Sequence, residues 1–151
     1  MSNMKLIGEA ARNSSRRLAM KSGSVRNDAI FCIGEKILEN LDSILEANNK
    51  DILSAKKDGL AEASVDRLLL TEDRLRSIVN DISNVISLQD PLGVMFDTKN
   101  MPNGLQVGKK RVPLGVIGVI YESRPNVTVD ISVLCIKSGN AAILRGGSEA
   151  F

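Results

Sequence analysis

The chain has 151 residues, a length that allows one domain with a substantial apolar core. Twenty Lys and Arg against 18 Asp and Glu leave a net charge of +2, and the only aromatic residues are one Tyr and three Phe. This composition excludes a polybasic nucleic-acid binder and the aromatic stacking on which single-strand binders depend. Histidine is absent, which excludes Ser-His and Cys-His nucleophile pairs, a His general base and His-ligated zinc within these residues.

Apolar residues spaced three and four apart predict helices from residue 3 to about residue 87. The first expected helix covers residues 4–20 and is ended by Gly23, and the second begins after the cap residue Ser24. The third is capped by Asp42 and followed by Gly59, a short fourth covers residues 63–70, and a longer fifth begins after Thr71 and stops at Pro91. The inner face of the second helix carries Ile30, Ile33, Ile37, Leu38 and Leu41. Cys32 and Cys135 belong to no CxxC pair, so we expect two small core residues and no metal site.

After Pro91 the helical period ends, and residues 94–112 predict a β-hairpin. Asn103-Gly104 is the strongest short-range signal for a tight turn between two strands. The charged run Lys109, Lys110 and Arg111 suits a projecting strand that avoids indiscriminate edge pairing.

Residues 113–145 predict the first βαβ unit of a parallel sheet. Val116 to Ile120 and Ala141 to Leu144 are nearly continuous apolar runs, a pattern typical of strands covered on both faces. Residues 127–133 alternate Val and Ile with polar residues, which favours a strand locally. Parallel neighbours need a crossover, for which residues 126–138 are long enough, and Pro125, Gly139 and the tail of residues 134–137 favour a helix. Two such strands cannot cover each other, so we expect a truncated sheet whose remainder lies further along a longer chain or comes from elsewhere.

No apolar run is long enough to cross a bilayer, and the N-terminus carries charges where a secretory signal needs apolar residues. We therefore expect a cytoplasmic protein that binds no membrane.

The segments VPLGVIGVIYESRPNVTVD and SGNAAILRGGSEA, with DGLAEASVDRLLLTEDRLRSI and DPLGVMFD upstream, resemble the gamma-glutamyl phosphate reductase family, also called glutamate-5-semialdehyde dehydrogenases, of the aldehyde dehydrogenase superfamily. The resemblance covers essentially the whole chain and implies an α/β fold. It implies that residues 1–93 are the helical part of the cofactor-binding domain, 94–112 an oligomerisation hairpin, and 113–151 the start of an NADP-binding Rossmann-like sheet, the catalytic domain being absent from these residues.

The activity that the resemblance implies is NADPH-dependent reduction of L-glutamyl 5-phosphate to L-glutamate 5-semialdehyde and phosphate, in proline biosynthesis. In the family a cysteine thiolate attacks the acyl phosphate, and hydride from NADPH reduces the resulting thioester. That cysteine stands in a Thr-Cys-Asn context in a later domain, and neither Cys32 nor Cys135 has such a context.

The family's oxyanion-hole Asn falls on Asn126, although an Asn after Pro is also common in turns. Arg124 is a candidate for holding the acyl phosphate, against the alternative of a surface Arg beside a turn. The resemblance implies cofactor binding by Arg145, Gly146, Gly147 and Ser148, with Glu149 as a candidate for the ribose hydroxyls. A cation, unshielded amides and a helix start at the carboxyl end of a strand suit a phosphate, although a Gly-Gly pair is more often merely a turn.

The implied partners are a homo-oligomer formed through the hairpin and the glutamate 5-kinase that supplies the substrate. Two alternatives remain: an oxidative semialdehyde dehydrogenase of the same superfamily, which YESRPN disfavours, and a non-catalytic fragment or assembly module that folds only against a partner.

Overall fold

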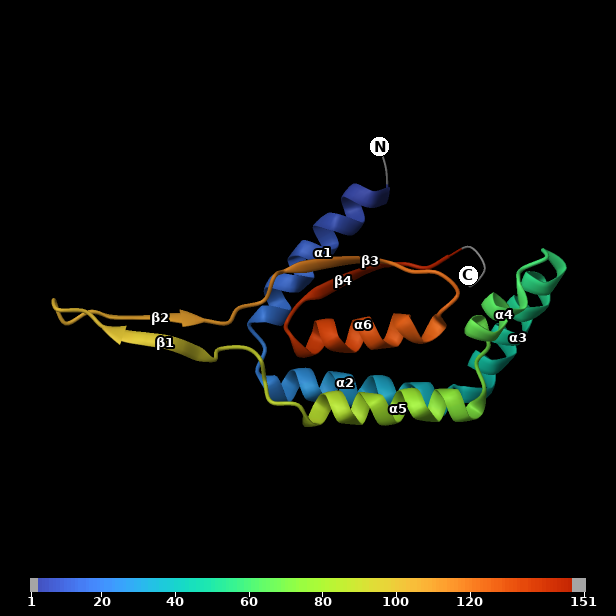
Figure 1. Cartoon of the computed structure of the whole chain (residues 1–151), viewed down its shortest axis with the longest axis horizontal. Coiled ribbons are helices and arrows are strands. Elements are labelled where there is room, and N and C mark those ends of the chain that lie inside the picture. The colour runs from blue at the N-terminus through green and yellow to red at the C-terminus, as the bar shows by residue number, and fades with distance from the viewer. Residues whose placement is uncertain (1–2, 148–151) are drawn as a thin grey trace.

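The computed structural model of the chain describes residues 3–147. Its elements are α1 (Asn3–Ala19), α2 (Gly23–Glu39), α3 (Leu41–Lys57), α4 (Glu62–Leu68), α5 (Glu72–Ser87), β1 (Met95–Asn100), β2 (Gln106–Lys110), β3 (Val116–Ile120), α6 (Pro125–Lys137) and β4 (Ala141–Arg145). A central body carries the β1–β2 hairpin at one end, and α3 and α4 angle away at the other (Figure 1). No helix in the described part of the chain has the length and apolar character that a membrane span requires.

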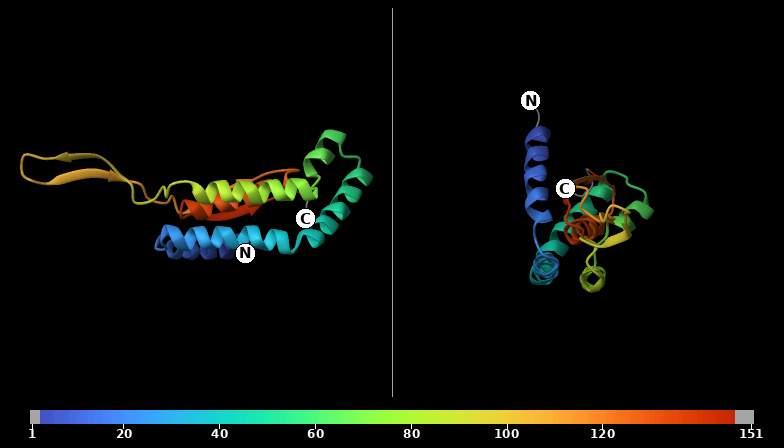
Figure 2. Two further views of the ribbon diagram at one scale, coloured as in Figure 1. Left: turned by 90° about the horizontal axis from the view of Figure 1, so that it is seen from below. Right: turned by 90° about the vertical axis from the view of Figure 1, so that its left-hand side faces the viewer.

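The core lies where α2 and α5, which run side by side, support α6 (Figures 1 and 2). Ile30 of α2, Leu75, Ile78 and Ile82 of α5, and Val133 of α6 form its buried cluster. These residues recur at helical spacing, so each helix buries one apolar stripe, and burial of such side chains is worth about 1.5–3 kcal/mol each. The core thus fixes the face that α6 turns away from the sheet.

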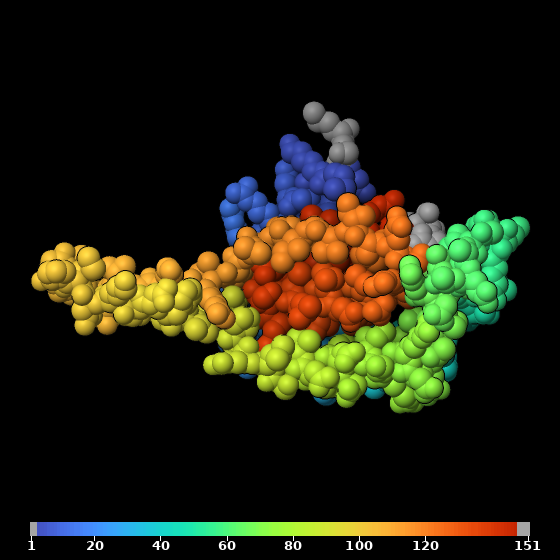
Figure 3. Space-filling view, viewed as in Figure 1, coloured from blue at the N-terminus to red at the C-terminus, as the bar shows by residue number. Residues whose placement is uncertain are grey.

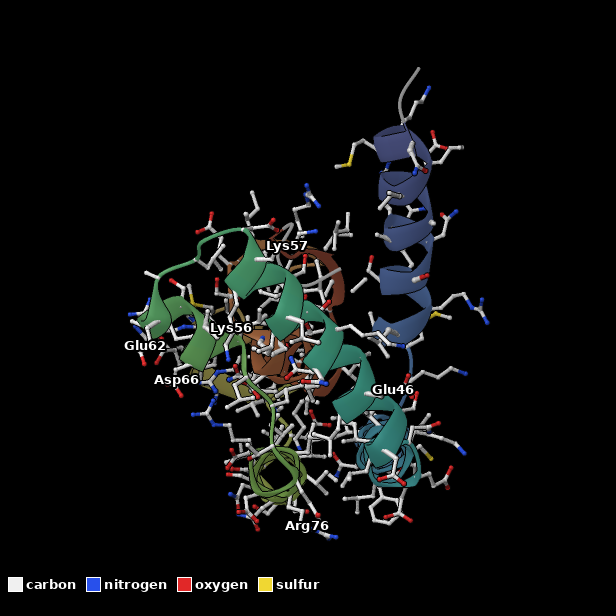
Figure 4. All side chains as sticks on the ribbon, turned by 90° about the vertical axis from the view of Figure 1, so that its right-hand side faces the viewer. Glu46, Lys56, Lys57, Glu62, Asp66 and Arg76 are labelled. Atoms are coloured by element: carbon white, nitrogen blue, oxygen red, sulfur yellow. The ribbon has the colours of Figure 1, made fainter. Side chains whose placement is uncertain are left out.

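A second, smaller cluster joins α3 to α4 through Ile52, Ala55 and Leu68. Asn48 of α3 is buried beside it, where its Nδ2 donates to the Leu68 carbonyl at 2.8 Å and its Oδ1 accepts from the Leu70 amide at 2.7 Å. Figure 4 views this end of the molecule and shows α4 alongside α3, close to the first turns of α5. Because a buried amide needs both kinds of partner, Asn48 fixes the α4–α5 connection.

Two helix starts differ from the sequence prediction. Ser22 caps α2, its Oγ accepting from the Val25 amide at 3.3 Å, so the assignment to Ser24 was wrong. Likewise α3 begins after Asn40, and Asp42 lies in its first turn without being the cap. Neighbouring Ser, Asn and Asp residues have similar capping ability, and the packing of the preceding helix selects among them. By contrast, Thr71 caps α5 as predicted, accepting from the Arg74 amide at 3.1 Å.

Gly23 was predicted to end the first helix, but α1 ends at Ala19 and Gly23 is the first residue of α2. A Cβ on Gly23 would lie 2.4 Å from Asp90 Oδ2, so the missing side chain allows a segment distant in sequence to approach. The role of Gly23 is therefore tertiary.

The predicted hairpin forms, with β1 and β2 antiparallel and every residue of both strands exposed. Residues 101–105 connect them, and Gly104 adopts φ +83° while its amide donates to the Met101 carbonyl at 2.9 Å. Glycine suits this backbone because it has no Cβ to clash. The hairpin projects from the body and buries no side chain of its own strands (Figure 1).

The predicted βαβ unit also forms, and α6 is a helix despite its alternating sequence. Strands β3 and β4 pair in parallel from Val116 opposite Ala141 to Ile120 opposite Arg145. The expectation that β3 is covered on both faces is not met by the described residues, since Ile120 is 84% exposed and Leu114, just before the strand, is 87% exposed. Within residues 3–147, α6 covers one face of the sheet and α1 packs against β4.

The two cysteines behave differently. Cys135 of α6 is buried as predicted, whereas Cys32 of α2 is exposed, so its assignment to the core was wrong. Cys32 falls beside the apolar stripe of α2, and it is the stripe itself that packs against α5 and α6.

Candidate functional site

The candidate site residues gather at the carboxyl edge of the two-stranded parallel sheet. Ile120 ends β3 directly opposite Arg145, which ends β4, and the Tyr121 amide donates to the Arg145 carbonyl at 3.1 Å. Both strands therefore deliver the chain to the same edge, which faces α3 and α4 (Figure 1). In open parallel sheets this edge is where ligands bind.

The loop from β3 to α6 places Arg124 and Asn126 close together at a helix start. Arg124 is the N-cap residue of α6, and Pro125 and Asn126 open its first turn. Just before them Ser123 adopts φ +45°, a left-handed backbone that few residues other than glycine take. Such strain is commonly retained where a loop must hold functional groups in one arrangement.

A pocket of about 390 Å³ runs between this helix start and α4 and α5. Arg124, Asn126, Arg67, Ser77 and Asp81 contribute to its lining. The Arg124 side chain is exposed and makes no hydrogen bond or ion pair with the described residues, so its guanidinium is available to a ligand. The space-filling view shows α6 between β3 and α5 on this side of the molecule (Figure 3).

Arg74 builds one wall of the same pocket. Its guanidinium donates to the carbonyls of Asp66 and Leu69 at 2.6 and 2.8 Å and pairs with the Asp66 carboxylate at 3.0 Å. These contacts tie α4 to the first turn of α5, and Figure 4 shows Asp66 at the outer surface of α4. Arg74 is therefore occupied by the protein itself, unlike Arg124.

The Asn126 amide is half-buried and donates from Nδ2 to Oδ2 of Asp130, one helical turn further along α6, at 3.0 Å. Burial raises the pKa of the Asp130 carboxyl above its usual value, the hydrogen bond from Asn126 lowers it, and the charge of Asp81 raises it further. One N–H of the amide is thus held by Asp130, and the residue still lines the pocket that Arg124 shares.

A second pocket of about 290 Å³ lies between α3 and the sheet edge. Arg124 and Gly147 both line it, together with Tyr121, Ser123 and Asp51. Burial raises the pKa of the Asp51 carboxyl. We call the first pocket, of about 390 Å³, the groove of Asn126. Because Arg124 lines both pockets, it connects this groove to the end of β4.

The predicted cofactor residues are placed only in part. Arg145 is exposed at the end of β4 and lines neither of these two pockets, and Gly146 and Gly147 follow it. A Cβ on Gly146 would lie 3.8 Å from the Tyr121 ring, an ordinary van der Waals distance, so the site is not crowded. Ser148 and Glu149 lie outside the described residues.

Sequence reasoning missed polar residues that line the pocket of Asn126, among them Asp81 and Arg67, and it missed Asp130, which holds the Asn126 amide. The spacing of Asp130, four residues after Asn126, is a signal that was present in the sequence. Asp81 and Arg67 come from other helices, and no local pattern links them to residue 126. Among the described residues no cluster of His, Cys, Asp and Glu could hold a metal ion.

No protein-family model matches this chain, but known proteins do. It is 50% identical over 149 residues to a gamma-glutamyl phosphate reductase of Photobacterium profundum, covering 99% of this chain and 36% of that protein. It is 52% identical over 145 residues to a Vibrio vulnificus protein of the same description, covering 96% of this chain and 35% of that protein. The chain therefore spans little more than a third of the length of these curated relatives.

Solved structures agree. The gamma-glutamyl phosphate reductase of Saccharomyces cerevisiae superposes with a TM-score of 0.95 at 38% identity, over 99% of this chain and 38% of that one. The Thermotoga maritima protein of the same description gives 0.91 at 42% identity, over 94% and 34%. A putative aldehyde dehydrogenase of Bacillus subtilis gives 0.67 at 17% identity over 94% and 29%, a likeness of fold alone.

Proposed function

Because this chain is homologous over its length to the N-terminal part of gamma-glutamyl phosphate reductases, we propose that it works within an enzyme that reduces L-glutamyl 5-phosphate with NADPH. The products are L-glutamate 5-semialdehyde and phosphate, a step of proline biosynthesis. The observation that carries the proposal is the groove at the carboxyl edge of the sheet, in which Asn126 and the exposed Arg124 lie side by side.

In this reaction Asn126 donates its remaining amide N–H to the acyl oxygen. Negative charge develops on that oxygen only as a nucleophile adds to the carbonyl, so a fixed neutral donor stabilises the transition state more than the substrate, by about 3 kcal/mol. Arg124 is exposed beside it and offers a planar pair of donors to the acyl phosphate oxygens. Asn126 thus acts on the acyl carbonyl and Arg124 on the phosphate of one substrate.

The chain's part in cofactor binding is assigned to Arg145, Gly146 and Gly147, with Ser148 and Glu149 beyond the described residues. An exposed cation followed by two glycines at the carboxyl end of a parallel strand fits the phosphates of a dinucleotide. NADPH, when bound, supplies the hydride. On this proposal residues 1–93 and 113–151 belong to the cofactor-binding domain, and the catalytic domain lies outside these 151 residues.

Neither cysteine of the chain is the nucleophile in this proposal. Cys135 is buried, burial raises the pKa of its thiol, and it does not line the groove of Asn126. Cys32 is exposed on α2 and lines neither pocket at the sheet edge. A thiolate attacks only when it is accessible and ionised, so the attacking sulfur belongs to the catalytic domain.

The hairpin of residues 94–112 is assigned to homo-oligomer formation. Met95, Phe96 and Val107 are exposed on it, and an isolated two-stranded hairpin is marginally stable in water. Pairing with the sheet of a second copy would supply its missing neighbours. We further propose a cytoplasmic location. We also propose that a glutamate 5-kinase supplies the acyl phosphate directly, because such mixed anhydrides hydrolyse readily in water.

A non-catalytic assembly module is the second candidate, and one observation favours it. Ile120 at the end of β3 and Leu114 just before the strand leave apolar surface uncovered, as expected of residues that complete their fold only against a further part of the protein. This candidate predicts that the chain contributes no residue to chemistry.

A chimera separates the two. This chain replaces the matching part of the Photobacterium profundum reductase, and phosphate-dependent reduction of NADP⁺ by L-glutamate 5-semialdehyde is followed in the reverse direction, which avoids the labile acyl phosphate. We expect turnover, a fall in kcat of about 100-fold for Asn126→Ala, and a raised KM for phosphate with Arg124→Ala. The exposed residues Asn49 and Arg16 supply matched controls, Asn49→Ala and Arg16→Ala, expected to leave the kinetics unchanged.

A soluble chimera without turnover would refute the enzymatic proposal. Turnover that survives Asn126→Ala within twofold would refute the role of Asn126 and favour the assembly module. An unchanged KM for phosphate in Arg124→Ala would remove Arg124 from the substrate site.

A further inference from the structure

The hydrogen bond between Asn126 and Asp130 suggests how the amide is oriented. We propose that Asp130 is a positioning residue for Asn126: it accepts one N–H of the amide and so fixes the orientation in which the other N–H serves the groove. This inference rests on the proposed function, because it gives Asp130 a role only if Asn126 assists the reaction.

An oxyanion donor of the Asn type needs such a constraint. The terminal torsion of Asn is broad, so the amide can turn and exchange its oxygen and nitrogen at little cost. The two orientations have opposite chemistry, since the nitrogen stabilises a developing negative charge and the carbonyl oxygen repels it. An unconstrained Asn126 would therefore spend part of its time in an orientation that opposes the reaction.

Asp130 is suited to supply the constraint. It lies one turn along the same helix, its carboxyl is half-buried, and its Oδ2 lies 3.0 Å from Asn126 Nδ2. A carboxylate accepts hydrogen bonds and does not donate them, so turning the amide would place two oxygens against each other. Burial and the charge of Asp81 raise the pKa of Asp130, and the hydrogen bond from Asn126 lowers it. The ionised carboxylate is the form that selects the orientation, because the protonated form can also donate.

The competing explanation is an ordinary polar pair on a helix surface. Such pairs add a little helix stability and have no bearing on turnover. Glu46 and Lys50 of α3 form a pair of this kind at the same spacing, exposed and away from the groove, so Glu46→Ala is the matched control.

The test measures kcat and KM of the full-length chimera for Asp130→Ala, Asp130→Asn, Asn126→Ala and the double variant Asn126→Ala/Asp130→Ala. We expect Asp130→Ala to lower kcat about tenfold, which is less than the roughly 100-fold fall expected when Asn126→Ala removes the amide donor. The KM should stay within twofold of the parent value. Asp130→Asn keeps an acceptor oxygen but adds an N–H donor that can also hold the turned amide, so it should recover only part of kcat. In the Asn126→Ala background, removing Asp130 should have no further effect, since its only route is the missing amide.

Three results would overturn the inference: a kcat within twofold of the parent for Asp130→Ala, an equal fall in both backgrounds, or a change confined to KM. If Asp130→Ala does not fold, Asp130→Leu, which keeps the shape and removes both oxygens, is judged by the same criteria. A kcat unaffected by Asn126→Ala refutes the proposed role of Asn126 itself, whereas a kcat lowered by Asn126→Ala but not by Asp130→Ala refutes only the positioning role.

Discussion

The ion pair between Arg26 and Asp90 gives the sharpest stability prediction. Arg26 is 3% exposed, its guanidinium donates to both Asp90 carboxylate oxygens at 2.6 and 2.7 Å and to the Lys21 carbonyl at 2.6 Å, and its Nε has no partner among the described residues. Asp90→Ala removes two of these three bonds and leaves a buried cation without its counter-charge. The pair connects the start of α2 to the segment that leads into the hairpin, so the loss is tertiary rather than local.

Removing one partner of a buried pair typically costs 3–5 kcal/mol. Asp90 is 39% exposed, so water screens the pair from the carboxylate side, and we expect the lower end, about 3 kcal/mol in the free energy of unfolding. For a chain of this size that corresponds to a melting temperature lower by roughly 6–12 °C.

Urea unfolding followed by circular dichroism measures the change, with Glu72→Ala as the control because it removes an exposed pair worth only about 0.3–0.5 kcal/mol. The double variant Arg26→Met/Asp90→Ala should be more stable than Asp90→Ala, since it leaves no buried charge. A loss below about 1 kcal/mol for Asp90→Ala, or a double variant no more stable than the single one, would refute the reasoning.

Three further predictions concern single residues. Gly139→Ala should destabilise the protein by about 2 kcal/mol or more, because φ is +72° and the new Cβ would lie 2.7 Å from Leu92 Cδ1; Gly59→Ala, at φ +75° in open space, should cost only about 1 kcal/mol in the same urea titration. Thr71→Ala removes the α5 cap and should cost about 1 kcal/mol, with Thr71→Ser recovering most of it in thermal melts. Burial raises the pKa of Asp51 in the folded protein, so its carboxylate opposes folding at pH values above its ordinary pKa. This penalty vanishes as the pH falls below that ordinary pKa, so Asp51→Asn should stabilise the protein more at pH 7 than at pH 3. An equal gain at both pH values would contradict the assignment.

Local chemistry determined most of the elements. The spacing of apolar residues predicted the faces of α2 and α5, Thr71 predicted the start of α5, and Asn103-Gly104 predicted the hairpin. For α6 the local alternation favoured a strand, and the need to connect two parallel strands correctly predicted a helix. The helix faces, the start of α5 and the hairpin depend on neighbours in sequence, so the sequence displays them directly, whereas α6 followed from the topology.

Tertiary packing decided the rest. Gly23 does not end α1 but lets Asp90 approach the start of α2. Asp81 reaches the groove of Asn126 from a different helix. Arg124 lines two pockets because the start of α6 faces α3 in one of them and α4 and α5 in the other. Hydrophobic periodicity tells which face of an element is buried but not against what it is buried, because burial is non-directional. Contacts between polar groups of different helices follow only once packing has brought those helices together.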